Sequence, residues 1–161
     1  MNKAIAEGSN APQFTLPING GGETSLADYA GRWLVLYFYP KDDTSGCTKE
    51  AIEFTNHLEA FAALDTHILG VSKDSVKKHE NFIEKHGLGV TLGSDEGLDT
   101  IQAFGVWVEK KMYGRVSMGI ERSTFLIDDK GVVQHVWRKV RVPGHVEAVL
   151  ERLNELKAGE S

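Results

Sequence analysis

One cysteine stands at a position in the sequence where a thiol would be chemically active. Cys47 is the only cysteine among 161 residues, and it lies where a strand-like apolar run gives way to a helix-like run. A thiol on the first turn of a helix lies beside backbone N–H groups that have no helical acceptor, which stabilises a thiolate. We therefore expect Cys47 to be a reactive nucleophile.

Other residues could serve this thiolate. Thr44, three residues earlier, could hold an oxygen-bearing substrate against the sulfur or cap the helix. Pro40 ends the strand rigidly and could shield the sulfur from water. Because the charges of Asp42 and Asp43 would oppose a thiolate, a cation must come from elsewhere. Arg122 is the best candidate, since it starts an apolar strand, where an arginine without a partner is costly.

Each of these residues also has an explanation that involves no chemistry. Free cysteine is among the most buried residue types, so Cys47 could be an inert core residue, although a turn at a helix start is not a core position. Thr44 could be a helix cap and nothing more. Arg122 could pair for structural reasons with a carboxylate such as Glu50.

The turn is expected to join a buried strand to an amphipathic helix. Residues 33–39 are almost continuously apolar, as in a central strand covered on both faces. Residues 51–64 carry apolar side chains three and four positions apart, which predicts a helix with one apolar stripe. Its stripe consists of Ala51, Phe54, Leu58 and Phe61.

Downstream, strands and helices alternate and a hairpin follows. Strands are predicted at 66–72 and 90–92, helices at 74–86 and 98–104, a hairpin over 121–137, and a last helix starting near Pro143. The pattern of residues 106–119 indicates neither a helix nor a strand. The aromatic residues and methionines of this segment could be core, active-site rim or dimer face. Alternation implies parallel neighbours. We expect an α/β, thioredoxin-like fold, with a mixed central sheet flanked by helices, an N-terminal extension and a single domain over 1–161.

Composition excludes several functions. A net charge of -5 argues against nucleic-acid and anionic-membrane partners. The chain shows neither a signal-peptide core nor 18 successive apolar residues, so a cytoplasmic location is expected. One cysteine excludes an intramolecular disulfide and a cysteine zinc site, and the six histidines lack metal-ligand spacing. We expect no metal and no other cofactor.

The motif Pro40-x-x-x-Thr44-x-x-Cys47, with Arg122 far downstream, resembles the active-site signature of peroxiredoxins. More narrowly, the chain is similar to the Q-type group, the bacterioferritin comigratory proteins. Supporting stretches at 11–17, 26–50, 68–75 and 112–127 span most of the chain. The resemblance implies a thiol peroxidase on a thioredoxin-like fold that reduces hydrogen peroxide and organic hydroperoxides in antioxidant defence.

The resemblance also implies roles for individual residues. Cys47 would attack the peroxide and become a sulfenic acid. Arg122 would stabilise the thiolate and the charge that develops as the O–O bond breaks, and Glu50 would hold Arg122. Pro40 would shield the site. The peroxide would be bound by Thr44, Gly46, Cys47 and Arg122.

Three positions depart from the Q-type pattern. Ser45 replaces the usual proline, and Ile52 and Ile83 occupy the two positions where the group places a resolving cysteine. The resemblance therefore implies a one-cysteine cycle restored by an external thiol: thioredoxin, glutaredoxin or glutathione. A monomer or weak dimer is expected. Two alternatives stay open. One is a redox sensor. The other is a thiol–disulfide oxidoreductase, although the missing second cysteine argues against it.

Overall fold

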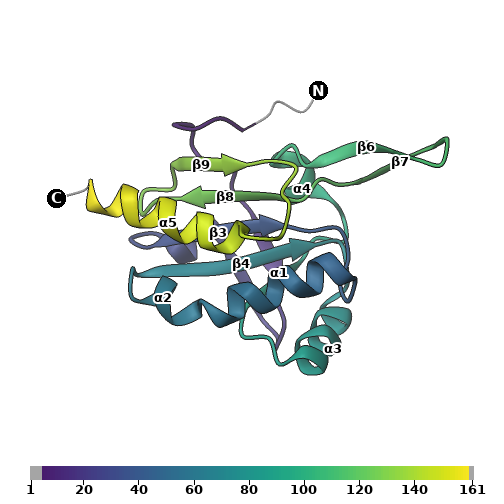
Figure 1. The fold of residues 1–161 in the computed structure, drawn as a ribbon, viewed down its shortest axis with the longest axis horizontal. Coiled ribbons are helices and arrows are strands. Elements are labelled where there is room, and N and C mark those ends of the chain that lie inside the picture. Colours follow the sequence, from purple (N-terminus) through teal and green to yellow (C-terminus); the bar gives the residue numbers. More distant parts are fainter. Residues whose placement is uncertain (1–4, 160–161) are drawn as a thin grey trace.

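A five-stranded mixed sheet forms the centre of the protein (Figure 1). The computed structural model describes residues 5–159. Strand β3 pairs in parallel with β4 and antiparallel with β8, β4 pairs in parallel with β5, and β8 pairs antiparallel with β9. In spatial order the strands are β5 (Thr91–Ser94), β4 (Thr66–Ser72), β3 (Trp33–Phe38), β8 (Ser123–Ile127) and β9 (Val133–Trp137).

Different segments cover the two faces of this sheet. One face packs against the helices α1 (Ser45–Asn56), α2 (Leu58–Ala62), α3 (Val76–His86) and α5 (His145–Ala158). The other is covered by the N-terminal segment with β1 (Thr15–Pro17), β2 (Glu23–Ser25) and the 3-10 helix η1 (Leu26–Tyr29), and by α4 (Asp99–Ala103). The expected α/β architecture, with a mixed sheet between helices, is confirmed.

Strand β3 positions the Cys47 turn, and its burial explains its composition. Val35 and Tyr37 face the helices α1 and α5, whereas Leu34, Leu36 and Phe38 face the N-terminal segment and α4. All six residues of the strand are buried, as predicted from the unbroken apolar run. The strand is therefore a rigid base that delivers the turn to a fixed place.

The bounds predicted for the helix over 51–64 are wrong at both ends. Helix α1 begins six residues earlier than the apolar stripe, because the polar turn itself forms its first residues, and it ends at Asn56. The His57 ring Nδ1 donates to the Glu53 carbonyl at 2.8 Å, and the His57 backbone N–H turns to the Phe54 carbonyl instead. This side-chain competition for the i−4 acceptor explains why the stripe continues in a separate helix, α2.

Residues 106–119, to which no helix or strand was assigned from the sequence, lie mostly in a hairpin. It consists of β6 (Trp107–Met112) and β7 (Arg115–Ile120) and protrudes from the body of the protein (Figure 1). Its two-residue turn places Tyr113 and Gly114 at φ 53° and 76°. Both central residues of such a turn need positive φ, and a tyrosine is an unusual choice there. The periodic sequence signal was weak because Met112, Tyr113 and Met118 are all exposed.

The remaining elements lie close to their predicted places. Gly87 ends α3 in the left-handed conformation, as expected of a C-terminal cap. Within residues 5–159, no helix has both the length and the apolar character needed to cross a membrane.

Candidate active site

The turn between β3 and α1 presents Cys47 on the first turn of a helix, as predicted. The first intrahelical bond of α1 is donated by Thr48 N–H to the Thr44 carbonyl at 2.8 Å. The N–H groups of Ser45, Gly46 and Cys47 precede it and have no acceptor within the helix. The residue Cys47 is only 2% exposed. A buried thiol on the first turn of a helix, where the N–H groups lack helical acceptors, is in an anion-stabilising position.

Arg122 is the cation that the turn required. It lies just before β8, which is antiparallel to β3, so the start of β8 meets the end of β3. Its Nη2 donates to Cys47 Sγ at 3.4 Å and its Nη1 to Glu50 Oε1 at 2.7 Å. Burial works against its charge, but Glu50 and Cys47 outweigh burial and raise the pKa of Arg122. The guanidinium is therefore permanently charged beside the sulfur.

Glu50 lies one turn after Cys47 on α1 and is fully buried. One carboxylate oxygen accepts from Arg122, whereas the other, Oε2, has no hydrogen-bond partner among residues 5–159. Burial raises the pKa of Glu50 to about 7, and the charge of Arg122 opposes that rise. The carboxyl group thus fixes the guanidinium but is itself only weakly held in its ionised form.

The structure separates the two explanations considered for Thr44. The residue occupies the N-cap position, yet its side chain makes no capping hydrogen bond. Instead its hydroxyl donates to the Lys41 carbonyl at 2.9 Å. Because that bond uses the only hydroxyl proton, the lone pairs of Oγ1 remain available to accept a proton from a bound ligand.

Gly46 allows the guanidinium to approach the turn. A Cβ atom built on Gly46 would lie 3.1 Å from Arg122 Nη2, the nitrogen that contacts the sulfur. Pro40 is half-buried and stands directly between β3 and the turn. All six residues expected at the site therefore gather at one end of the sheet: Pro40, Thr44, Gly46, Cys47, Glu50 and Arg122.

Replacing Gly46 by alanine should slow the oxidation of Cys47 by peroxide without lowering the stability of the fold. The guanidinium would have to shift by a few tenths of an ångström, and we expect the rate of thiol oxidation by peroxide to fall about 10-fold. Alanine is a better helix former than glycine, so the melting temperature should not fall. Gly97→Ala is the matched control, because a Cβ there meets open space. An unchanged peroxide rate in Gly46→Ala would contradict the assigned role.

Replacing Glu50 by glutamine should remove a pH-dependent contribution to stability. As the pH rises, the unfolded chain releases this proton near 4.5 and the folded chain only near 7. The free energy of unfolding should therefore fall between those pH values, by up to about 3 kcal/mol, and stay level above them. Urea titrations from about pH 4 to about pH 8 measure this slope.

The matched control for this experiment is Glu151→Gln, an exposed position on α5. It should keep the wild-type slope, whereas Glu50→Gln should lose part of it. A slope that is the same in all three proteins would show that Glu50 titrates normally.

Asp42 and Asp43, which were expected to oppose the thiolate, both have partners on α3 that reduce the charge they present to the sulfur. Asp42 contacts the buried His79 ring at 2.7 Å. Asp43 is paired with Lys85 and His86, and those two hydrogen bonds lower the pKa of Asp43. The sequence contained a signal for His79, since it lies three residues from Val76 and three from Phe82, on the same inward stripe of α3.

The hairpin contributes a residue to this region that the sequence did not indicate. Burial lowers the pKa of Lys110 on β6; the charge of Arg122 lowers it further and that of Cys47 raises it. Lys110 therefore lies within electrostatic range of both groups. His145, at the start of α5, is buried and also lies within electrostatic range of Arg122. Burial and the charge of Arg122 lower the pKa of His145 to about 4, so it is neutral at pH 7.

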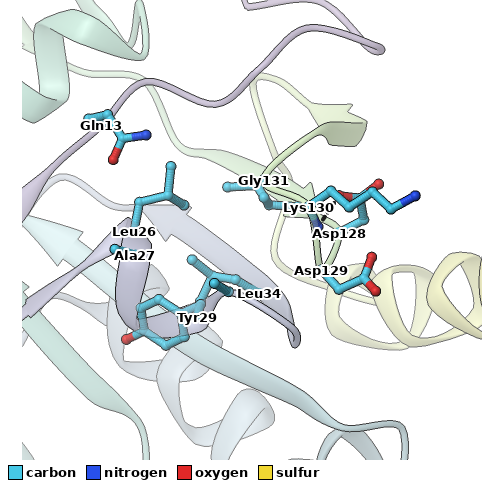
Figure 2. Close-up of a pocket in the computed structure, with 11 residues that line it drawn as sticks. Gln13, Leu26, Ala27, Tyr29, Leu34, Asp128, Asp129, Lys130 and Gly131 are labelled. Carbon is cyan, nitrogen blue, oxygen red and sulfur yellow. Dashed lines mark hydrogen bonds between the residues drawn. The ribbon is translucent and has the colours of Figure 1, made fainter.

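A separate pocket of about 230 Å³ lies at the other end of β3, between η1 and the turn after β8 (Figure 2). The Asp128 carboxylate there accepts from the backbone N–H groups of Lys130 and Val132 and from the Gln134 side chain. Its polar group is thus occupied in holding the turn. The chemistry of the chain is concentrated at the Cys47 end.

Comparison with known proteins links this geometry to one family. Residues 8–136 match the AhpC/TSA family. Peroxiredoxin Bcp of Xanthomonas campestris is 50% identical over 155 residues, which are 95% of this chain and 96% of that protein. Peroxiredoxin Bcp of Bacillus subtilis is 48% identical over 152 residues, 94% of this chain and 97% of that protein.

Solved structures of Q-type peroxiredoxins have the same fold as this chain. Xylella fastidiosa PrxQ superimposes with a TM-score of 0.89 at 42% identity and covers 99% of both chains. The Xanthomonas campestris bacterioferritin comigratory protein, studied for alkyl peroxide reduction, gives a TM-score of 0.85 at 48% identity over 88% of this chain and 90% of its own. These matches confirm the thioredoxin-like fold. Xanthomonas campestris peroxiredoxin Q has been solved with either of two different cysteines replaced, whereas this chain has one cysteine.

Proposed function

Because the chain belongs to the AhpC/TSA family and, within it, to the Bcp (PrxQ) peroxiredoxins, which are thiol-dependent peroxidases, we propose that Cys47 reduces hydrogen peroxide and organic hydroperoxides in antioxidant defence. The single observation that carries this proposal is the contact of Arg122 Nη2 with the buried Cys47 sulfur, at the start of α1. It supplies both an activated thiolate and a donor for the leaving oxygen.

The reaction begins when a peroxide enters the turn and Thr44 Oγ1 accepts the hydrogen bond of its O–H. The Cys47 thiolate attacks the near oxygen, the S–O bond forms and the O–O bond breaks. The backbone N–H groups of Gly46 and Cys47 and the guanidinium of Arg122 stabilise the charge on the departing oxygen. This oxygen leaves as water or an alcohol after taking from solvent the proton that the thiol released when it ionised. Cys47 is left as a sulfenic acid. Pro40 shields the sulfur, and Glu50 holds Arg122 in place.

The proposed cycle is completed by another molecule. The positions where Q-type relatives carry a resolving cysteine hold Ile52, 36% exposed on α1, and Ile83, partly buried on α3. An external thiol condenses with the sulfenic acid to give a mixed disulfide and water, and a second thiol releases Cys47. Thioredoxin, glutaredoxin and glutathione are the candidate reductants.

Mass spectrometry after one equivalent of hydrogen peroxide tests this cycle. Without added thiol, the chain should gain one oxygen at Cys47 and form no internal disulfide. Glutathione should convert that species to a mixed disulfide, and steady-state turnover should follow with one of the three reductants. If Cys47 oxidises but no thiol supports repeated turnover, the peroxidase proposal fails and a sensor is favoured.

We further propose that residues 1–161 act as one peroxiredoxin domain in the cytoplasm, where thiol reductants are abundant. A monomer or weak dimer fits the distribution of exposed apolar side chains. Among residues 5–159, most of the large ones lie on one hairpin: Met112, Tyr113, Val116 and Met118.

A further inference from the structure

Tyr39, Asp42 and His79 form a buried hydrogen-bonded triad behind the Cys47 turn. None of the three is among the residues proposed to contact the peroxide. Tyr39 Oη donates to Asp42 Oδ1 at 2.6 Å, and the other oxygen of Asp42 lies 2.7 Å from His79 Nδ1. The second ring nitrogen of His79, Nε2, lies 3.0 Å from the Gly93 carbonyl on β5. All three side chains are buried. The triad thus joins the end of β3, the turn, α3 and β5.

The partners of His79 define its charge. Nδ1 faces a carboxylate and Nε2 faces a backbone carbonyl, and both of these groups are acceptors. A neutral imidazole carries only one N–H, so beside an ionised Asp42 carboxylate only the imidazolium satisfies both contacts. Tyr39 Oη also lies 3.4 Å from His79 Nδ1, but its single hydroxyl proton serves the much shorter contact of 2.6 Å with Asp42. Burial raises the pKa of Tyr39, which therefore remains a neutral donor. The triad is therefore a buried ion pair of His79 and Asp42, in which the Tyr39 hydroxyl donates a hydrogen bond to the carboxylate.

A buried ion pair is a poor way to stabilise a core. Replacement of such a pair by apolar residues is often neutral or stabilising, because desolvation offsets the attraction of the charges. What the pair provides is a single defined geometry. Its position immediately before Thr44 and Cys47 identifies the geometry concerned as that of the turn.

The backbone of Asp42 is held as firmly as its side chain. Its N–H donates to Asp74 Oδ2 at 2.8 Å, and the Ser72 hydroxyl donates to the same oxygen at 2.7 Å. The adjacent Lys41 carbonyl is the acceptor of the Thr44 hydroxyl. Any movement of Asp42 therefore moves the carbonyl that orients Thr44.

We propose that His79 is a positioning residue: as an imidazolium it fixes Asp42 and, through Asp42, the turn that directs Thr44 towards a peroxide at Cys47. This inference rests on the peroxidase reaction proposed above. The surface pairs of Asp43 with Lys85 and His86 are exposed and contribute little to the same restraint.

The charge of His79 can be measured in the wild-type protein without any peroxide. In ¹⁵N-labelled, reduced protein at about pH 7, imidazole correlation spectra should show protons on both ring nitrogens of His79. The His79→Gln variant identifies the signals. A His79 ring with one unprotonated nitrogen would overturn the proposal.

Two reactions of Cys47 then separate positioning from general stability. Iodoacetamide needs only an accessible thiolate, whereas peroxide also needs Thr44 and Arg122 in place. In His79→Gln, the rate with hydrogen peroxide should fall about 10²-fold, the scale of a ~1 Å misplacement, while alkylation should not slow, because a loosened turn exposes the sulfur. His67→Gln, an exposed histidine at the far end of β4, should change neither rate.

Each outcome of this comparison decides the proposal. Rates that are both unchanged in folded His79→Gln, or that fall together, overturn it. If His79→Gln does not fold, the isosteric Asp42→Asn variant should show the same divergence, and sequential resonance assignment of the wild-type protein identifies the His79 ring signals instead. If wild-type Cys47 does not react with peroxide, the peroxidase proposal fails, whereas the charge of His79 is still measured.

Discussion

Cys47→Ser should reduce peroxide turnover to background. The chain has no second cysteine that could take over, and a serine hydroxyl is a far weaker acid and nucleophile than a thiol. Loss of a catalytic nucleophile costs on the order of 10⁶-fold in a well-studied hydrolase, and we expect a loss of that kind here. Peroxide consumption with a saturating thiol reductant measures it.

Ser45→Ala is the control for this substitution. It removes a neighbouring exposed hydroxyl from the same turn of α1, and its turnover should stay within about twofold of wild type, as is usual for surface changes away from buried contacts. Clear peroxide consumption by Cys47→Ser would mean that another group carries the reaction.

Arg122→Ala should lower the rate of peroxide reduction by about 10²–10³-fold, the usual effect of removing one donor to a developing oxyanion. The substitution removes the 3.4 Å contact with Cys47 Sγ and the 2.7 Å contact with Glu50 together. Stopped-flow oxidation under single-turnover conditions measures the chemical step. Arg122→Lys should lie between the two proteins, because an ammonium keeps the charge but cannot contact both partners in a fork.

The same variant should also be less stable, in a pH-dependent way. Glu50 would be left buried without its cation, and breaking a buried pair costs about 3–5 kcal/mol. That loss should be smaller below about pH 7, where Glu50 takes up a proton. Arg115→Ala, at an exposed position on β7, should change neither rate nor stability. A normal peroxide rate in Arg122→Ala would remove Arg122 from the mechanism.

Local signals in the sequence were sufficient for the frame of the site. The apolar run of β3 and the turn residues after it placed Cys47 at a helix start, and the cost of an arginine beside an apolar strand indicated Arg122. The antiparallel pairing of β3 with β8 then brings the two together across 75 positions of the chain. Such non-local pairing was inferred from need and resemblance, since no local pattern encodes it.

Other features depended on tertiary contacts that no single segment contains. Asp42 was interpreted as a charge opposing the thiolate because its partner, His79, lies 37 residues away on α3. Helix α1 ends at Asn56 because of a side-chain contact of His57, although the apolar stripe continues. The β6–β7 hairpin escaped prediction because its exposed strands bury little and its turn uses Tyr113 at positive φ.

The central claim is that Cys47 is an activated thiolate that attacks peroxide, and one measurement tests it most directly. The reduced protein is mixed with one equivalent of hydrogen peroxide in the presence of a sulfenic-acid trap, and the rate of adduct formation at Cys47 is compared with that of free cysteine. We predict near-stoichiometric adduct on Cys47, formed orders of magnitude faster than free cysteine reacts. A rate no greater than that of free cysteine would contradict the account.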